Sequence, residues 1–134
     1  MQAQLDLKYV ALVGTPNSGK SSLFNLLTGS RQRVGNYPGV TVEKKVGLLK
    51  LAKGQKIQLI DLPGTYSLKP QSIDEQITCD VLNHGGALKK LPDAVIAVAD
   101  ATNLERTLAL VLEIRGKNIP VIVALNMMDL AVSR

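Results

Sequence analysis

Runs of apolar residues indicate several buried strands along the chain. Continuous runs lie at residues 9–13, 93–99 and 121–125. A run without polar alternation is typical of a strand that is covered on both faces, as in a parallel sheet. Residues 42–51 and 56–62 alternate more loosely on either side of a lysine–glycine turn, and this pattern predicts a hairpin of two strands.

Helical periodicity fills most of the intervals between these strands. Residues 19–27 and 104–115 place leucines on one face, and each segment is followed by a glycine, which favours a helix end. Residues 72–82 repeat apolar side chains at every fourth position, and Ser72 is the expected N-cap. Residues 30–41 contain two glycines, a proline and an asparagine, and we expect a long loop there.

The alternation of strands and helices predicts an α/β fold. We expect a mostly parallel, twisted sheet with helices on both faces and right-handed crossovers. The length of 134 residues suits a single domain, residues 1–134. Ligands of such sheets bind beyond the carboxyl ends of the strands, so the polar motifs of a site should directly follow apolar runs.

Composition narrows the classes of function. Hydrophobic residues make up 46% of the chain and charged residues 20%, which is typical of a folded globular domain. Aromatic residues are only 3%, and this argues against a surface that stacks nucleic-acid bases. The single cysteine and single histidine, Cys79 and His84, exclude an internal disulfide and a zinc site with four protein ligands. We interpret Cys79 as a small buried residue and His84 as a surface or C-cap residue.

Charge is unevenly distributed along the chain. The net charge is +5, and residues 1–67 hold nine Lys and Arg against three Asp and Glu. Such a basic half could attract RNA or an anionic membrane face, or it could be a solvated surface beside a polyphosphate site. No stretch approaches the ~18 apolar residues of a membrane helix, and the N-terminus lacks signal-peptide features, so we expect this piece of chain to be soluble.

The first site motif is a full match to the phosphate-binding pattern G-x-x-x-x-G-K-[ST]. It covers residues 14–21, between the first predicted strand and the first predicted helix. Glycines allow backbone N–H groups to surround the α- and β-phosphates, Lys20 reaches the β- and γ-phosphates, and the Ser21 hydroxyl suits Mg²⁺. We expect nucleotide contacts here from Gly14, Thr15, Pro16, Asn17, Ser18, Gly19, Lys20, Ser21 and Ser22.

The second motif is D-L-P-G at residues 61–64, where a predicted strand ends. Its carboxylate, Asp61, can hold Mg²⁺ through water, and the Gly64 N–H can contact a γ-phosphate. An ordinary Pro-Gly turn is the alternative, but the position directly after a strand favours the nucleotide site. The expected contacts are Asp61, Leu62, Pro63 and Gly64.

The third motif, N-M-M-D, follows the apolar run at residues 121–125. Its carboxylate, Asp129, can accept hydrogen bonds from both the ring N–H and the exocyclic amine of guanine, and adenine offers no such pair. The motif therefore selects GTP over ATP, and Met127 in place of the usual lysine predicts modest affinity. The expected base contacts are Asn126, Met127, Met128 and Asp129.

Together the three motifs predict a GTPase, and they give the loop at residues 30–41 a function. Thr41 is the natural switch threonine, which closes on Mg²⁺ and the γ-phosphate when GTP is bound and moves away after hydrolysis. The alternative is a β-branched residue that merely starts a strand. We expect nucleotide contacts in this segment from Gly39, Val40, Thr41, Val42 and Glu43.

Longer segments resemble one GTPase family. The segments GTPNSGKSSLFNLLTG, RVGNYPGVTVEKKVG, DLPGTYSL, DATNLERTL and IPVIVALNMMD are similar to the N-terminal GTPase domain of the FeoB family of bacterial ferrous iron transporters. The resemblance implies a P-loop NTPase fold, with GTP or GDP and Mg²⁺ bound, at the cytoplasmic face of the bacterial inner membrane. It also implies a membrane transport domain in the same polypeptide that moves Fe²⁺, and it makes small accessory proteins of the iron-uptake system candidate partners.

Catalytic assignments combine the motifs with this resemblance. In the family, the asparagine that corresponds to Asn17 helps to hold K⁺ against the phosphates, so we assign K⁺ to Asn17, with a simple turn residue as the alternative. Thr65 stands where many small GTPases place the glutamine that orients water, and we expect slow intrinsic hydrolysis. The expected catalytic residues are Asn17, Lys20, Thr41 and Gly64, and the expected Mg²⁺ ligands are Ser21, Thr41 and Asp61.

Two other functions fit the same motifs. A free-standing RNA or ribosome-assembly GTPase would use the same phosphate loop and the basic half. Such proteins usually carry an attached RNA-binding domain, and we identify none in residues 1–134. We therefore expect no nucleic-acid partner. A nucleotide-binding switch without meaningful turnover is the other. Domains of this type are generally longer, and we expect residues 1–134 to lack the guanine-backing loop, the last strand and the last helix.

Overall fold

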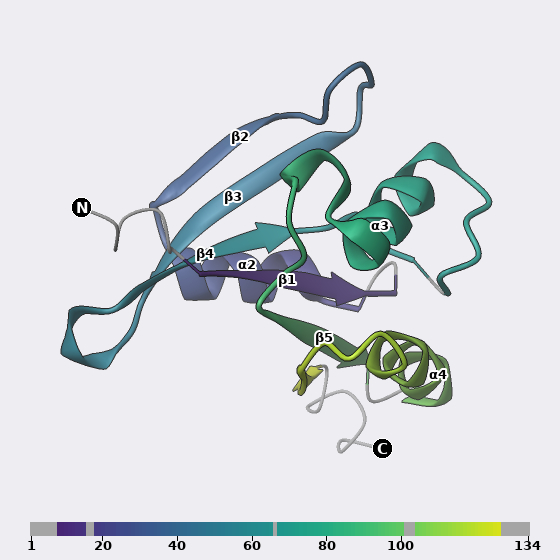
Figure 1. The fold of residues 1–134 in the computed structure, drawn as a ribbon. Helices are drawn as coiled ribbons and strands as arrows, with labels where there is room; N and C mark the ends of the chain where they lie inside the picture. Colours follow the sequence, from purple (N-terminus) through teal and green to yellow (C-terminus); the bar gives the residue numbers. More distant parts are fainter. Residues whose placement is uncertain (1–7, 16–17, 66, 101–103, 127–134) are drawn as a thin grey trace.

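The computed structural model describes residues 8–15, 18–65, 67–100 and 104–126. The strands of this part form one sheet in the order β2-β3-β4-β1-β5-β6 (Figure 1). In chain order the elements are β1 (Tyr9–Gly14), α2 (Lys20–Thr28), β2 (Gln32–Asn36), β3 (Glu43–Lys50), β4 (Lys56–Asp61), α3 (Ile73–His84), β5 (Ala94–Asp100), α4 (Leu104–Arg115) and β6 (Val121–Asn126).

The sheet is parallel in one half and antiparallel in the other. β1 pairs in parallel with both β4 and β5, and β5 pairs in parallel with β6. β2, β3 and β4 form an antiparallel ribbon, and Figure 1 shows β2 at the outer edge of the sheet, beside β3. Short turns suffice for the antiparallel strands, whereas the parallel pairs need helical crossovers. The predicted α/β fold is confirmed, including its hairpin.

Helices cover both faces of the sheet, as expected. α2 lies on one face, where Phe24 is fully buried in a cluster with Leu12 and Leu59. α3 and α4 contribute to the core of the other face the buried residues Val81, Leu82, Leu110, Val111 and Ile114. In the part of the chain described above, no helix combines the length and the apolar character needed to cross a membrane.

The segment expected to form one long loop contains a strand. β2 pairs with β3 from Gln32 opposite Gly47 to Asn36 opposite Glu43. Four of its five residues are exposed, so the sequence lacks the apolar alternation that marks a half-buried strand. The loop prediction was wrong for residues 32–36 because the strand is formed by pairing at the sheet edge, which the local pattern does not encode.

Caps define the ends of α3. Ser72 Oγ accepts a hydrogen bond from the Glu75 N–H at 3.2 Å, which confirms Ser72 as the N-cap. The helix continues past the predicted end at residue 82 to His84, and Gly85 follows at φ 91°. Cys79 is buried, and His84 is exposed at the end of the helix, as expected.

Candidate functional site

The phosphate-loop motif lies between β1 and α2, at the carboxyl end of β1. Gly14 ends the strand, and a Cβ atom there would lie 2.7 Å from Ser18 Oγ. Gly19 precedes α2 at φ 89°, a left-handed conformation that favours glycine. A side chain at Gly14 would therefore displace Ser18, and one at Gly19 would be strained. Pro16 and Asn17 lie outside the described residues.

The second motif begins beside this loop, where β4 ends. Lys20 Nζ donates a hydrogen bond to Asp61 Oδ1, and the two side chains form an ion pair. They are 11% and 9% exposed, so the pair is largely removed from water. β1 and β4 are parallel neighbours, and their carboxyl ends meet at one edge of the sheet. The structure therefore brings the first two motifs side by side.

A cavity of about 470 Å³, called the first cavity below, opens beside the start of α2. A helix N-terminus presents unpaired N–H groups and a positive dipole, so it favours anions. The cavity combines both motifs with a carboxylate from the first turn of α3, Asp74. Its lining residues are Thr15, Gly19, Lys20, Ser21, Ser22, Gly64 and Asp74.

A second cavity, of about 200 Å³, adjoins the first and shares Lys20, Ser21 and Asp74 with it. Its remaining lining residues are Val42, Glu43, Lys45, Asp61, Leu62 and Pro63. It brings the switch segment, residues 30–43, together with the second motif. Hydroxyl and carboxylate oxygens of the lining residues could act as metal ligands there. The sequence favours a first-turn helix residue over a metal ligand for Asp74, and only the structure places Asp74 in the lining of both cavities.

Only part of the switch segment reaches these cavities. Val42 and Glu43 line the second cavity, whereas Thr41 is exposed and lines neither one. Also outside both linings are Gly39 and Val40. The structure therefore does not bring Thr41 together with the two other predicted Mg²⁺ ligands.

The loop after the second motif is anchored by two carboxylates. Thr65 is buried, and its hydroxyl lies 3.2 Å from Glu75 Oε2 and 2.6 Å from the Ser67 carbonyl oxygen. The Leu68 N–H donates a hydrogen bond to Glu113 Oε2 of α4 at 3.1 Å. Sequence reasoning missed both anchors, because no local motif connects a loop with two separate helices.

The third motif begins at the same edge of the sheet as the first two. Asn126 ends β6 and lies opposite Asp100, the last residue of β5, in a parallel pairing. β5 also runs parallel to β1, so Asn126 is at the carboxyl edge predicted for it. Outside the described residues lie Met127, Met128 and Asp129, whose contacts to guanine stay predictions.

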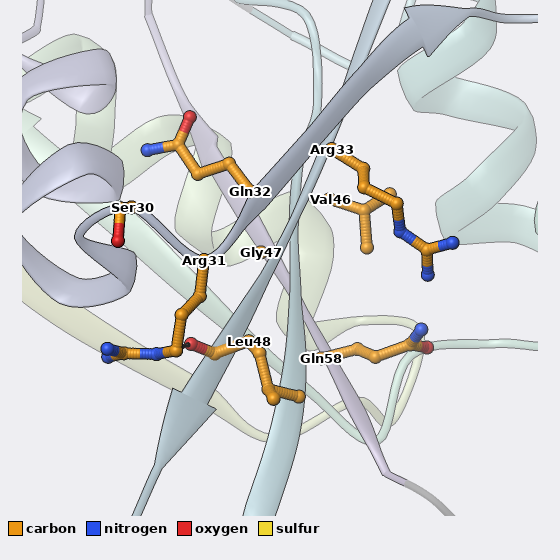
Figure 2. Close-up of a pocket in the computed structure, with 8 residues that line it drawn as sticks. All are labelled: Ser30, Arg31, Gln32, Arg33, Val46, Gly47, Leu48 and Gln58. Atoms are coloured by element: carbon orange, nitrogen blue, oxygen red, sulfur yellow. Dashed lines mark hydrogen bonds between the residues drawn. The ribbon is translucent and has the colours of Figure 1, made fainter.

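A third cavity, of about 310 Å³, is formed on the β2–β3–β4 ribbon and contains no residue of the three motifs (Figure 2). Arg31 Nε donates a hydrogen bond to the Leu48 carbonyl oxygen at 3.4 Å. Among the described residues neither Arg31 nor Arg33 forms an ion pair. The cavity is lined by Ser30, Arg31, Gln32, Arg33, Val46, Gly47, Leu48 and Gln58. Part of the basic half is therefore a surface separate from the nucleotide motifs.

Comparison with protein families gives a match over residues 8–134 to the model described as "Ferrous iron transport protein B". The Fe(2+) transporter FeoB of Escherichia coli K12 is 53% identical over 126 residues, which are 91% of this chain and 16% of that protein. The FeoB of Salmonella typhimurium LT2 is 52% identical over the same shares. The chain thus spans about a sixth of the length of the curated relatives that it matches.

Solved structures from the same family have the same fold. The G domain of the T. maritima FeoB iron transporter is 52% identical, with a TM-score of 0.86, over 96% of this chain and 77% of that one. The cytosolic domain of that transporter in its GMPPNP form matches with a TM-score of 0.85 over 95% of this chain and 48% of the other. Its GDP form I matches with a TM-score of 0.84 over the same shares.

Proposed function

The chain belongs to the family of ferrous iron transport protein B, and from this premise we propose that it binds and hydrolyses GTP to regulate Fe²⁺ uptake. The observation that carries the proposal is the pair of adjoining cavities, which share Lys20 and Ser21 where β1 and β4 end. The GDP and GMPPNP forms of the similar T. maritima domain support a guanine nucleotide as the ligand.

The first cavity holds the phosphates in this proposal. Backbone N–H groups of the phosphate loop and of the start of α2 donate to the α- and β-phosphates, because both the loop and the helix dipole favour negative charge. Lys20 leaves Asp61 and pairs with the β- and γ-phosphates. Gly64, which lines the same cavity, offers its N–H to the γ-phosphate.

The second cavity fits Mg²⁺. Mg²⁺ prefers oxygen ligands and is usually held by one or two protein groups together with phosphates and water. The Ser21 hydroxyl and the Asp61 carboxylate both line this cavity, and no group of three or more His, Cys, Asp or Glu side chains in the described residues forms an all-protein metal cage. Mg²⁺, when bound, would neutralise charge between the β- and γ-phosphates, with Ser21, Asp61 and, after the switch closes, Thr41 as its protein ligands.

Hydrolysis is slow without further activation in this proposal. Thr65 occupies the position of the usual water-orienting glutamine, and its hydroxyl already contacts Glu75 and the Ser67 carbonyl. We assign the activating role to K⁺ held by Asn17, which would place positive charge against the phosphates as an arginine finger does. Asn126 and Asp129 select guanine in the same proposal, while Met127 and Met128 lie along the base.

Coupling to transport completes the proposal. The switch segment and the loop anchored by Glu75 and Glu113 change with the nucleotide, and they pass this state to the membrane domain of the same polypeptide or to small accessory proteins. The chain would work at the cytoplasmic face of the inner membrane, and nucleic acid would not be a partner. The family match argues against the alternative function, which is a free-standing RNA or ribosome-assembly GTPase.

Turnover measurements in two salts test the proposal. Phosphate release from GTP is measured under single-turnover conditions in K⁺ and in Na⁺ for the parent chain and for Asn17→Ala. We expect the parent to be faster in K⁺ and the variant to be equally slow in both salts. Lys20→Ala, which removes the phosphate contact, is the control for a dead nucleotide site.

Different outcomes separate the parts of this proposal. Equal parent rates in both salts would remove the role of K⁺. Nucleotide binding without any phosphate release would leave a switch without turnover, and binding of ATP as tight as that of GTP would contradict the assignment of the third motif.

A further inference from the structure

Tyr37 is buried, although it lies in the connection between β2 and β3 and directly follows an exposed strand. Its side chain is only 2% exposed, although Asn36, Pro38 and Gly39 around it are all exposed. The ring belongs to the core cluster that also contains Ile60 of β4. The tip of the switch segment is therefore docked onto the core, and Tyr37 is the buried aromatic side chain of this contact.

The docked ring carries an unsatisfied polar group. Tyr37 Oη is buried and has no hydrogen-bond partner among the described residues. Tyr9 is equally buried in the same cluster, but its hydroxyl donates to the Lys90 carbonyl oxygen. A buried hydroxyl without a partner destabilises the arrangement that buries it. The docking of Tyr37 is therefore weaker than its buried area alone would make it.

The turn that buries Tyr37 also determines where Thr41 lies. The Tyr37 N–H donates to the Val42 carbonyl oxygen at 3.0 Å, and the Val40 N–H donates to the Tyr37 carbonyl oxygen at 3.3 Å. Val40 and Val42 both pack against the core cluster, while Thr41 between them is exposed. Thr41 cannot turn toward Ser21 unless this hydrogen-bonded turn rearranges.

We propose that Tyr37 is a positioning residue that holds the switch segment docked with Thr41 turned outward, and that its unpartnered hydroxyl keeps this docking weak enough for GTP to reverse. The inference rests on the proposed function, because GTP reverses the docking through Mg²⁺ and the γ-phosphate. Tyr37 thereby sets the ratio between the affinity for a GTP analogue and the affinity for GDP.

The test compares two tyrosine-to-phenylalanine variants of the chain. Tyr37→Phe removes the unpartnered hydroxyl and keeps the ring, so the thermal midpoint of the nucleotide-free protein should rise by about 2–4 °C. The affinity for GMPPNP relative to GDP, measured in Mg²⁺, should fall by about three- to tenfold, because the docked arrangement is stabilised. Tyr9→Phe is the matched control: it leaves the Lys90 carbonyl unpaired, so it should lower the midpoint and leave the affinity ratio unchanged.

Tyr37→Ala gives a change of the opposite sign. Loss of the ring should undock the tip, lower the midpoint and shift the affinity ratio toward GMPPNP. If this variant does not fold, Tyr37→Phe decides the question alone.

Each failure has its own signature. A midpoint of Tyr37→Phe at or below that of the parent, or an unchanged affinity ratio, would overturn the role of Tyr37 while GTP binding by the parent stands. Failure of the parent to bind either nucleotide would instead overturn the proposed function, and the role of Tyr37 with it.

Discussion

Lys20 and Asp61 neutralise each other where α2 begins and β4 ends, in an ion pair that is largely removed from water. Both residues have other partners in the proposed nucleotide complex, where Lys20 contacts phosphate and Asp61 faces Mg²⁺. In this proposal, nucleotide binding replaces the Lys20–Asp61 pair by two other pairs of opposite charges, Lys20 with phosphate and Asp61 with Mg²⁺. The proposal therefore requires the ion pair of this structure to break when nucleotide binds.

Removing one member of this pair should destabilise the protein more than removing both. Lys20→Met leaves the buried Asp61 carboxylate uncompensated, and we expect a loss of about 3 kcal/mol in the free energy of unfolding. The double variant Lys20→Met/Asp61→Asn should recover most of this loss. Urea denaturation of the parent, both single variants and the double variant gives the coupling energy. Additive effects of the two substitutions would show that the pair contributes nothing.

Thr41→Ala should separate nucleotide recognition from stability. The side chain is exposed, so the free energy of unfolding without nucleotide should change by less than about 0.5 kcal/mol. The affinity for GMPPNP in Mg²⁺ should fall by about tenfold, because one contact to the metal is lost, while the affinity for GDP serves as the internal control and stays constant. A parallel loss of affinity for both nucleotides would argue against a switch role for Thr41.

Gly47→Ala should damage the packing between α2 and β3. A Cβ atom at Gly47 would lie 2.3 Å from Thr28 Cγ2 and 2.8 Å from Thr28 Cβ, and Thr28 is fully buried. We expect a loss of about 2 kcal/mol or more, because the buried end of α2 at Thr28 must shift to admit the methyl group. Gly35→Ala on the neighbouring strand is the control, since nothing lies within 4 Å of a Cβ atom there. Equal urea midpoints for the two variants would contradict the close contact.

Stability should fall in strongly alkaline solution as Tyr9 ionises. Burial, with the Asp93 carboxylate as the smaller cause, raises the pKa of Tyr9 from 10.0 to about 12. Folding therefore favours the protonated phenol, and the stability that it contributes is complete below pH 10 and lost as the pH rises to about 12. Tyr37, whose pKa burial also raises, acts in the same direction. Denaturation at several alkaline pH values should give a shallower loss for Tyr9→Phe than for the parent, and identical slopes would contradict the shift.

Local sequence patterns predicted the elements whose hydrogen bonds and caps are local. The helix expected over residues 104–115 matches α4, and Ser72 caps α3 as its side-chain chemistry requires. The phosphate-loop motif also contains Gly14 and Gly19, where the structure shows a close approach of Ser18 at Gly14 and a left-handed backbone at Gly19. Patterns of this kind depend on neighbours within a few residues, so these elements can be predicted directly from the sequence.

Contacts between distant segments could not be predicted from such local patterns. β2 forms through its pairing with β3 at the sheet edge, and its mostly exposed residues show no hydrophobic pattern that would predict this pairing. Glu113 reaches the Leu68 N–H across 45 positions of sequence, and Asp74 joins both cavities only because α3 begins beside the phosphate loop. Each of these contacts depends on how whole elements pack, and no single segment contains that information.

The sequence by itself predicted the chemistry of the proposed site, because phosphate, Mg²⁺ and guanine each demand particular side chains at particular spacings directly after strands. Only the tertiary structure decided the state of that site: Lys20 paired with Asp61, Tyr37 turned into the core and Thr41 turned out to solvent. The physical reason is that a motif specifies which groups can meet a ligand, whereas burial and long-range pairing specify where those groups lie.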